Sequence, residues 1–295
     1  MRFAMLVKSD AKSEAGVLPD EKLLSAMGEF NEAMLRAGVM LAGEGLKASS
    51  FGSRIRSAAG KVTVGEGPFG ETKDLVAGYW FIRAGSMPEA IEWARRVPFV
   101  DGQIELRPLY ELSDFAIDPG SQPEMWREQE QNQRAGIAAA PPARLPGTKR
   151  FVVLLHADKN TESGMPANEE LLSAMGALMD EMSKAGALLG GEGLKQTSLG
   201  ARVEFSGGKA RVLDGPFAES KELVAGISLV QLKNKQEAVE FARRMLQIHM
   251  TGTGISEGTV DVRELFELED FPVDSAEKPD GWRQKEREQR GRISA

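Results

Sequence analysis

Glu66-Gly67-Pro68-Phe69-Gly70-Glu71-Thr72-Lys73-Asp74-Leu75-Val76-Ala77-Gly78 stands in the first half of the chain. The second half carries a close copy, Asp214-Gly215-Pro216-Phe217-Ala218-Glu219-Ser220-Lys221-Glu222-Leu223-Val224-Ala225-Gly226. Equivalent residues are 148 positions apart, from 66 to 214. At 295 residues the chain has room for two domains of ordinary size, so this spacing indicates a tandem duplication.

Each copy predicts the same order of elements. In the first copy short apolar runs predict strands, helical spacing after a capping residue predicts helices, and two runs around Ala59-Gly60 predict a hairpin. The expected elements are strand 3–7, helix 20–35, strand 39–41, hairpin 53–64, strand 79–82, helix 90–97 and strand 104–107. Few helices beside a mostly antiparallel sheet predict an α+β sandwich of ferredoxin-like type, with one sheet face left uncovered.

The composition changes between the copies. Residues 1–116 and 149–272 are the expected domains, 117–148 a polar helix followed by a Pro- and Ala-rich linker, and 273–295 a charged C-terminal tail. Two copies with uncovered sheet faces favour an intramolecular pseudo-dimer, in which each half covers the other about a pseudo-twofold axis.

Composition limits the function. The formal net charge of −7 argues against a basic nucleic-acid-binding surface. The chain has no cysteine, and two scattered histidines predict neither a metal site nor any cofactor. No run approaches the roughly 20 apolar residues of a membrane helix, and the first residues do not form a signal peptide, so we expect a cytoplasmic protein with no membrane contact.

The duplicated stretch resembles the YCII-related, or DGPF, domain family. Asp214 to Phe217 spell the tetrapeptide that names the family, whereas Glu66 replaces the aspartate in the first copy. Two further segments resemble the family twice and in order: Gly-Glu-Gly-Leu at 43–46 and 191–194, and Glu-Ala-x-Glu-x-Ala-Arg-Arg at 89–96 and 237–244. The resemblance implies ferredoxin-like domains that pair as a dimeric α/β barrel.

The resemblance implies less about activity. Most family members have no assigned reaction, some lie beside or are fused to extracytoplasmic-function sigma factors, and some relatives are thought to use a histidine–aspartate pair. This chain has only His156 and His249, at non-equivalent positions, and Lys8 stands where His156 would be in the first copy. A histidine-based mechanism therefore does not carry over to the first half.

Charged residues of the duplicated stretch form the first candidate site. Glycine and proline in the Gly-Pro-Phe element predict a tight turn, with its phenylalanine as a core anchor. The acid and base that follow are either ligand contacts facing one cleft or a solvated ion pair of little weight. These residues are Glu71, Lys73, Glu219 and Lys221.

Other candidates come from strand ends and hairpins. Glu44 and Glu192, each between two glycines, either point into an inter-sheet cavity, where burial raises the pKa towards that of a general base, or point outward at a bulge. Four basic residues either bind a carboxylate or phosphate or are surface charges. They are Lys47, Arg54, Lys195 and Arg202.

The last strand of each copy alternates apolar and polar residues. We assign its apolar side to the helices, which places the pairs Glu105/Arg107 and Asp261/Arg263 on the uncovered side of the sheet. There they form either a salt-bridge network or a polar pocket between the halves.

Three functions follow. The first is a small-molecule-binding or regulatory module with a polar pocket near the interface of the halves. The second is a cofactor-independent isomerase, lyase or monooxygenase, with Glu44 or Glu192 as base and Arg54 or Arg202 holding an oxyanion. The third is an interaction partner of a sigma factor, bound through residues 123–134 and the tail after Trp282.

Overall fold

The computed structural model describes residues 1–70, 74–114, 144–165, 167–217, 223–271, 288, 289 and 292. These residues form two six-stranded sheets whose neighbouring strands are all antiparallel. In spatial order the first sheet consists of β10 (Lys209–Asp214), β9 (Ala201–Ser206), β6 (Gly102–Pro108), β1 (Arg2–Lys8), β5 (Val76–Arg83) and β2 (Met40–Gly45). The second consists of β4 (Lys61–Glu66), β3 (Ser53–Ala58), β12 (Glu257–Glu264), β7 (Lys149–His156), β11 (Val224–Leu232) and β8 (Leu188–Gly193).

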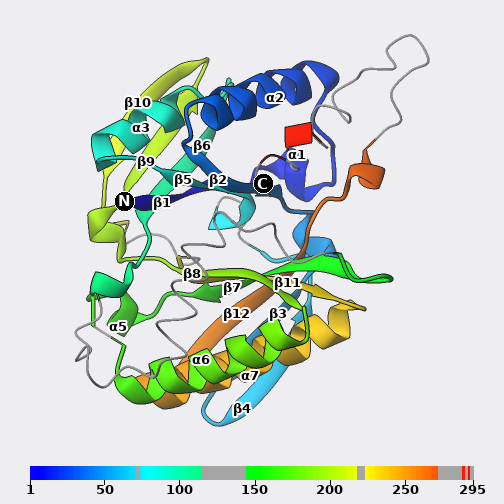
Figure 1. The fold of residues 1–295 in the computed structure, drawn as a ribbon, viewed down its shortest axis with the longest axis vertical. Coiled ribbons are helices and arrows are strands. Elements are labelled where there is room, and N and C mark those ends of the chain that lie inside the picture. The colour runs from blue at the N-terminus through cyan, green and yellow to red at the C-terminus, as the bar shows by residue number, and fades with distance from the viewer. Residues whose placement is uncertain are drawn as a thin grey trace.

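Helices cover the outer face of each sheet (Figure 1). The described helices are α1 (Ala11–Glu14), α2 (Glu21–Arg36), α3 (Met87–Arg95), α5 (Lys159–Glu162), α6 (Glu169–Lys184) and α7 (Lys235–Thr253). As the sequence predicts, α2 begins after Asp20, which accepts a bond from the Leu23 amide at 2.8 Å, and ends before Gly38 in the left-handed region. The short helices α1 and α5 were not predicted.

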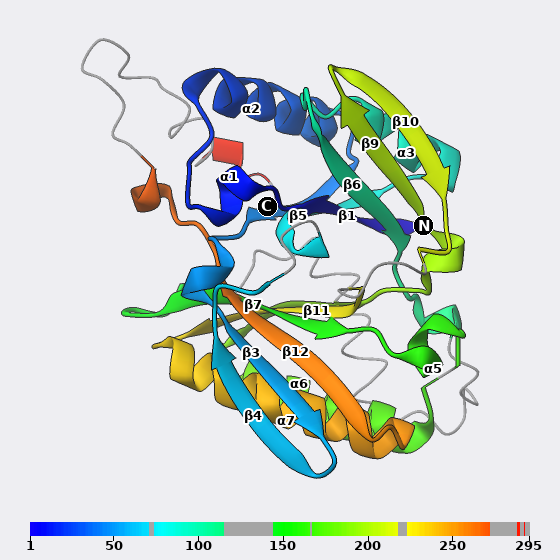
Figure 2. The ribbon, with the colours of Figure 1, turned by 180° about the vertical axis from the view of Figure 1, so that it is seen from behind.

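The hairpins are exchanged between the halves. The sequence predicts the hairpins but not their partners: β3 of the first half pairs with β12, and β9 of the second half pairs with β6. Figure 2 shows the two exchanged hairpins beside these strands. Ile55 and Val203 carry the exchange into the opposite cores and are fully buried there. Burial of such a side chain contributes about 1.5–3 kcal/mol, so the exchange is part of both cores.

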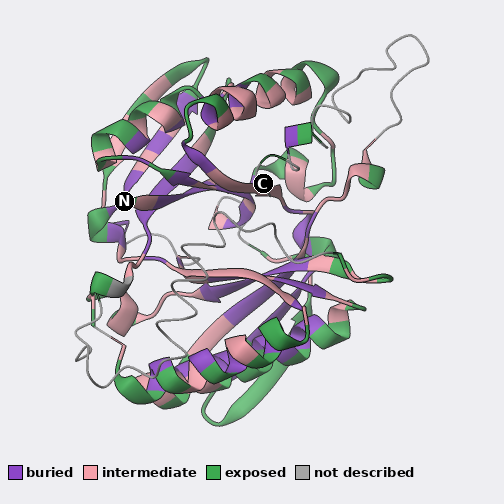
Figure 3. Cartoon of the chain, in the orientation of Figure 1, coloured by how far each residue is buried: buried purple, intermediate pink, exposed green. Residues whose placement is uncertain are grey.

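The two sheets pack face to face, as expected for an α+β pseudo-dimer. Along β1, Phe3 and Met5 join the core under the helices, whereas Ala4 and Leu6 join a separate apolar cluster between the sheets. That cluster takes side chains from both halves, and Figure 3 shows the buried strands that form it. Ile104 and Leu106 lie on the helix side, which confirms the face assigned to them.

The described residues near the C-terminus contact the first half. Gln289 Nε2 donates to the Gly28 carbonyl at 2.9 Å, and Arg292 Nη1 lies 2.7 Å from Glu32 Oε2. Both partners lie on α2. The C-terminal residues therefore cover part of the helical layer of the first half.

Candidate functional site

Two clusters of buried charges flank the apolar centre between the sheets. The Lys8 cluster consists of Lys8, Glu105, Arg107, Glu162 and Arg202. The His156 cluster consists of His156, Asp261, Arg263, Glu14 and Arg54. The residues correspond in that order under the duplication: Lys8, Glu162 and Arg202 lie 148 positions from their counterparts. Glu105 and Arg107 lie 156 positions from theirs, because the second copy has extra residues around His249 to Gly258.

Strand register assembles each cluster from both halves. Asp261 on β12 lies opposite Arg54 on the exchanged β3, and Glu105 on β6 lies opposite Arg202 on the exchanged β9. Cross-strand neighbours project from the same face of a sheet, so each arginine points toward a carboxylate of the other half. The hairpin exchange is therefore what completes each cluster.

The Lys8 cluster is saturated with internal ion pairs. Glu105 Oε2 lies 3.2 Å from Lys8 Nζ and 2.9 Å from Arg202 Nη2, while its Oε1 accepts from Arg107 Nη1 at 3.1 Å. Burial by itself would raise the pKa of the fully buried Glu105, but Lys8, Arg107 and Arg202 hold it at about 2. This carboxylate is charged at neutral pH and fully paired.

The His156 cluster has a different centre. Both oxygens of Asp261 accept from Arg54, at 2.6 Å from Nε and 2.7 Å from Nη2, and Oδ2 also lies 3.0 Å from His156 Nε2. Burial alone would raise the pKa of Asp261, but His156 and Arg54 lower it to about 2. The His156 side chain is 10% exposed, compared with 2% for Lys8. A histidine–aspartate pair thus stands in the second half, although the sequence left this position in doubt.

The two equivalent arginines differ in their partners. Arg107 donates through Nε to the Lys195 carbonyl and through Nη1 to Glu105. Arg263 donates through Nη2 to the Lys47 carbonyl at 2.7 Å and to Glu14 at 3.3 Å, but its Nε and Nη1 are buried with no partner among the described residues. Burial lowers the pKa of Arg263. A buried donor without a partner costs about 1–3 kcal/mol.

The Gly-Pro-Phe turns support the clusters. The Arg54 guanidinium lies 4.4 Å from the centroid of the Phe69 ring, and Arg202 lies 4.1 Å from that of Phe217. Phe69 and Phe217 thus stack on arginines outside the three apolar clusters. Phe217 is buried, as expected for a core anchor, whereas Phe69 is half-buried. Gly67 is required by close approach, because a Cβ there would lie 1.8 Å from the Ser49 carbonyl oxygen.

Glu44 and Glu192 point inward and pair across the halves. Glu44 accepts from Arg150, which also binds Glu267 at 3.1 Å, and Glu192 accepts from Arg2. Burial raises the pKa of Glu192 to about 7 despite the contact with Arg2. Arginine contacts occupy both glutamates, so neither is the best candidate for a general base.

The remaining predicted residues divide into two groups. Lys47 lies 2.8 Å from Asp270 and Lys195 lies 2.6 Å from Asp114, so both join ion pairs between the halves. The other group, Glu71, Lys73, Glu219 and Lys221, lies outside the described residues. So do residues 123–134 and, apart from 288, 289 and 292, the tail 273–295.

Sequence reasoning missed Glu14 and Glu162. Each ends a short helix with a capping box, at Asp10 for α1 and at Asp158 for α5. Both glutamates also bind the start of the next 3-10 helix, Glu14 at the Ser49 amide (2.9 Å) and Glu162 at the Thr197 amide (3.2 Å). The signal was present, because the two glutamates match at the 148-residue spacing.

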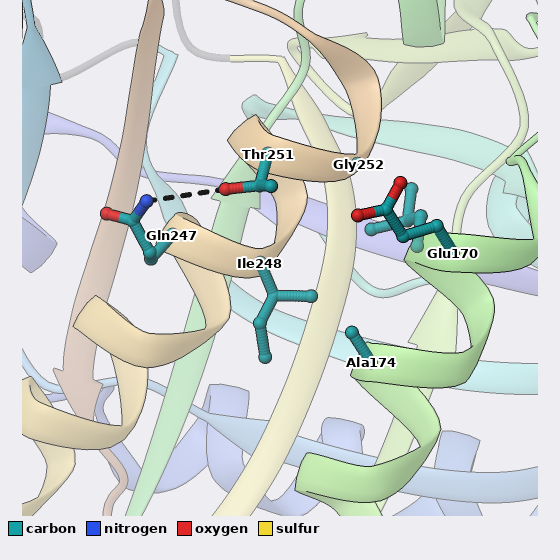
Figure 4. Close-up of a pocket in the computed structure, with 7 residues that line it drawn as sticks. Glu170, Ala174, Gln247, Ile248, Thr251 and Gly252 are labelled. Carbon is teal, nitrogen blue, oxygen red and sulfur yellow. Dashed lines mark hydrogen bonds between the residues drawn. The ribbon is translucent and has the colours of Figure 1, made fainter.

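A groove of about 150 Å³ lies elsewhere, between α6 and α7 (Figure 4). Its lining is mostly apolar, and its polar Gln247 and Thr251 side chains bond to each other at 3.3 Å. None of the residues predicted from sequence lines it. In the parts of the chain that the structure describes, no three His, Cys, Asp or Glu side chains group as metal ligands.

These features define a class: an α+β pseudo-dimer with two related charged clusters between its sheets. The family model for the YCII-related domain matches the chain twice, over residues 1–113 and 150–253, and the chain belongs to that family. An uncharacterised protein of Rhizobium meliloti (strain 1021) is 30% identical over 117 residues, which cover 39% of this chain and 90% of the relative. No helix among the described residues has the length and apolarity to cross a membrane.

Proposed function

We propose that the chain binds a small molecule at the His156 cluster, and that the Lys8 cluster is its structural counterpart. The observation that carries this is the contact of His156 with Asp261, which replaces the contact of Lys8 with Glu105. A lysine suffices to neutralise a buried carboxylate, as the first half demonstrates. Histidine instead offers an imidazole with two ring nitrogens, a group that enzymes use for proton transfer and that a purely structural ion pair does not require.

The same contact favours a second candidate, a cofactor-independent enzyme. Asp261 orients the imidazole of His156. Arg54 binds the same carboxylate and is therefore the cation beside the imidazole that would stabilise a developing oxyanion. His156 then replaces Glu44 and Glu192 as the proton-transfer group. The test is hydrogen–deuterium exchange at the carbon next to the carbonyl group of a bound compound, measured in D₂O as loss of its C–H signal in the NMR spectrum. We expect His156→Gln to abolish this exchange.

The binding proposal is tested by thermal shifts across a metabolite library. We expect compounds that raise the Tm of the wild-type chain not to raise the Tm of His156→Lys, the variant that copies the residue of the first half. Lys8→Arg, which keeps the charge in the other cluster, should retain the shifts. The proposal fails if no compound stabilises the folded wild type, or if shifts survive in His156→Lys.

A further inference from the structure

A comparison of the two buried arginines, Arg107 and Arg263, shows that the His156 cluster lacks hydrogen-bond acceptors. Arg107 Nη1 has a partner oxygen 3.1 Å away, supplied by Glu105. The equivalent atom of Arg263 has no partner among the described residues, and neither has its Nε, although the side chain is 1% exposed. The clusters therefore differ at two donors of this arginine, and at one of them, Nη1, the acceptor in the Lys8 cluster is a carboxylate oxygen.

The cause is the length of one side chain. Asp261 is one methylene shorter than Glu105, and Arg54 and His156 engage both of its oxygens. In the Lys8 cluster the longer Glu105 reaches Lys8 and Arg202 with one oxygen and Arg107 with the other. The shorter carboxylate thus leaves the donor Arg263 Nη1 without an acceptor among the described residues.

We infer that Arg263 Nη1 receives an oxygen of a small carboxylic acid, which is the ligand class of the His156 cluster. This inference rests on the proposed function and specifies its ligand. A guanidinium attracts a carboxylate oxygen by opposite charge as well as by hydrogen bonding, and a neutral oxygen lacks the charge attraction. Asp261 and Glu14 already offset Arg54 and Arg263, so a single added negative charge fits the cluster better than a phosphate dianion does.

Helix α1 lies over the guanidinium that carries this donor. Glu14 on α1 lies over Arg263 Nη2, at 3.3 Å. In the other half, α5 is held from outside, because His249 lies 2.8 Å from its capping Asp158 and the Thr253 carbonyl accepts from Asn160 at 3.3 Å. Asp10, which caps α1, bonds instead to Ser13 within the same turn. Displacement of α1 therefore opens the His156 cluster more easily than displacement of α5 opens the Lys8 cluster.

The test is an NMR titration of the ¹⁵N-labelled full chain with sodium acetate, sodium pyruvate and sodium benzoate, observed at the arginine Nε–H signals. Acetamide is the neutral isostere of acetate. We expect saturable shifts with at least one carboxylate and binding of acetamide that is weaker by about tenfold or more. Asp261→Glu supplies the missing oxygen from within, so it should weaken carboxylate binding by about tenfold or more without a fall in Tm.

The inference is overturned if no carboxylate gives saturable shifts, if acetamide binds as well as acetate, or if Asp261→Glu retains carboxylate binding. These outcomes are separable from failure of the proposed function. If neutral compounds raise the Tm of the wild type but not that of His156→Lys, the proposed binding at the His156 cluster holds. The inference that its ligand is a carboxylate is then wrong.

Discussion

His156 Nε2 lies 3.0 Å from Asp261 Oδ2, on neighbouring strands of the second sheet. At the equivalent place in the first sheet, Lys8 Nζ lies 3.2 Å from Glu105 Oε2. The duplication therefore preserved an inward-facing nitrogen beside a carboxylate while changing both residue types. One copy became a closed ion-pair network, and the other acquired a group suited to proton transfer.

Conservative exchange of the two carboxylates should have unequal effects on stability. Glu105→Asp removes the partner of Arg107 Nη1 and should lower the free energy of unfolding by about 1–3 kcal/mol. Asp261→Glu gives Arg263 a partner and should cost nothing or stabilise the fold. Urea unfolding measures both. Glu204→Asp on β9, where Glu204 binds Gln103 at 3.2 Å, controls for the intrinsic cost of the exchange. Equal losses in both cluster variants would contradict the account.

Protonation of Glu105 should lower the free energy of unfolding at acid pH. Its pKa is lowered from 4.5 to about 2, so its contribution to stability is complete above pH 4.5 and is lost as the pH falls toward 2. The shift corresponds to on the order of 3 kcal/mol. The free-energy gap between the wild type and Glu105→Gln should therefore narrow as the pH falls from 5 to 2.5. Urea titrations at several pH values measure it, and a constant gap would show that Glu105 is not held charged by its partners.

Glu192 should act with the opposite sign. Its pKa is raised from 4.5 to about 7, so its contribution is complete below pH 4.5 and is lost as the pH rises through 7. In Glu192→Gln the stability should vary less between pH 5 and pH 8 than it does in the wild type. Denaturant unfolding at these pH values tests this. An unchanged slope would mean that Arg2 keeps Glu192 charged throughout.

Neither half should fold as an isolated monomer. Residues 1–114 lack the β9–β10 hairpin that completes their sheet, and residues 144–271 lack β3–β4. Each half alone should either self-associate or lack a cooperative unfolding transition, whereas a mixture should form a 1:1 complex. Light scattering and denaturant unfolding distinguish these states. A cooperatively folded monomer from one half would show that the hairpin exchange is dispensable.

The restraint of α5 by His249 should be visible in hydrogen exchange. His249→Ala removes the bond to Asp158, so amides in 158–165 should exchange faster and approach the rate in 10–17. Gln247→Ala on the same helix is the control, because the Gln247 side chain bonds to Thr251 rather than to α5. Unchanged exchange in 158–165 would show that His249 does not restrain this segment.

The sequence was sufficient for the fold class because periodicity and capping are local. The helix after Asp20 and the apolar side of β6 follow directly from residue spacing. The hairpin exchange was not predictable, because a strand pattern shows that a segment pairs but not with which edge. Copies related by duplication offer each hairpin two nearly equivalent edges, and the sequence does not distinguish them.

The site was predictable in part. Arg54, Arg107, Arg202 and Arg263 were all candidates, and all lie in the two clusters. Glu44 and Glu192 point inward, as one of the two alternatives predicted. There they form ion pairs with Arg150 and Arg2, and residue spacing does not predict these partners. The Gly-Pro-Phe turn, which we expected to serve only the core, places Phe69 and Phe217 on the cluster arginines.

The central claim is that binding occurs at the His156 cluster, and the chain offers a direct reporter because it contains only two histidines. The ¹H–¹³C spectrum of the imidazole Cε1–H groups has one signal from His156 and one from His249, and His156→Lys assigns them. Titration with compounds that stabilise the wild type should shift the His156 signal saturably and leave His249 in place. A stationary His156 signal, or movement confined to His249, would contradict the claim.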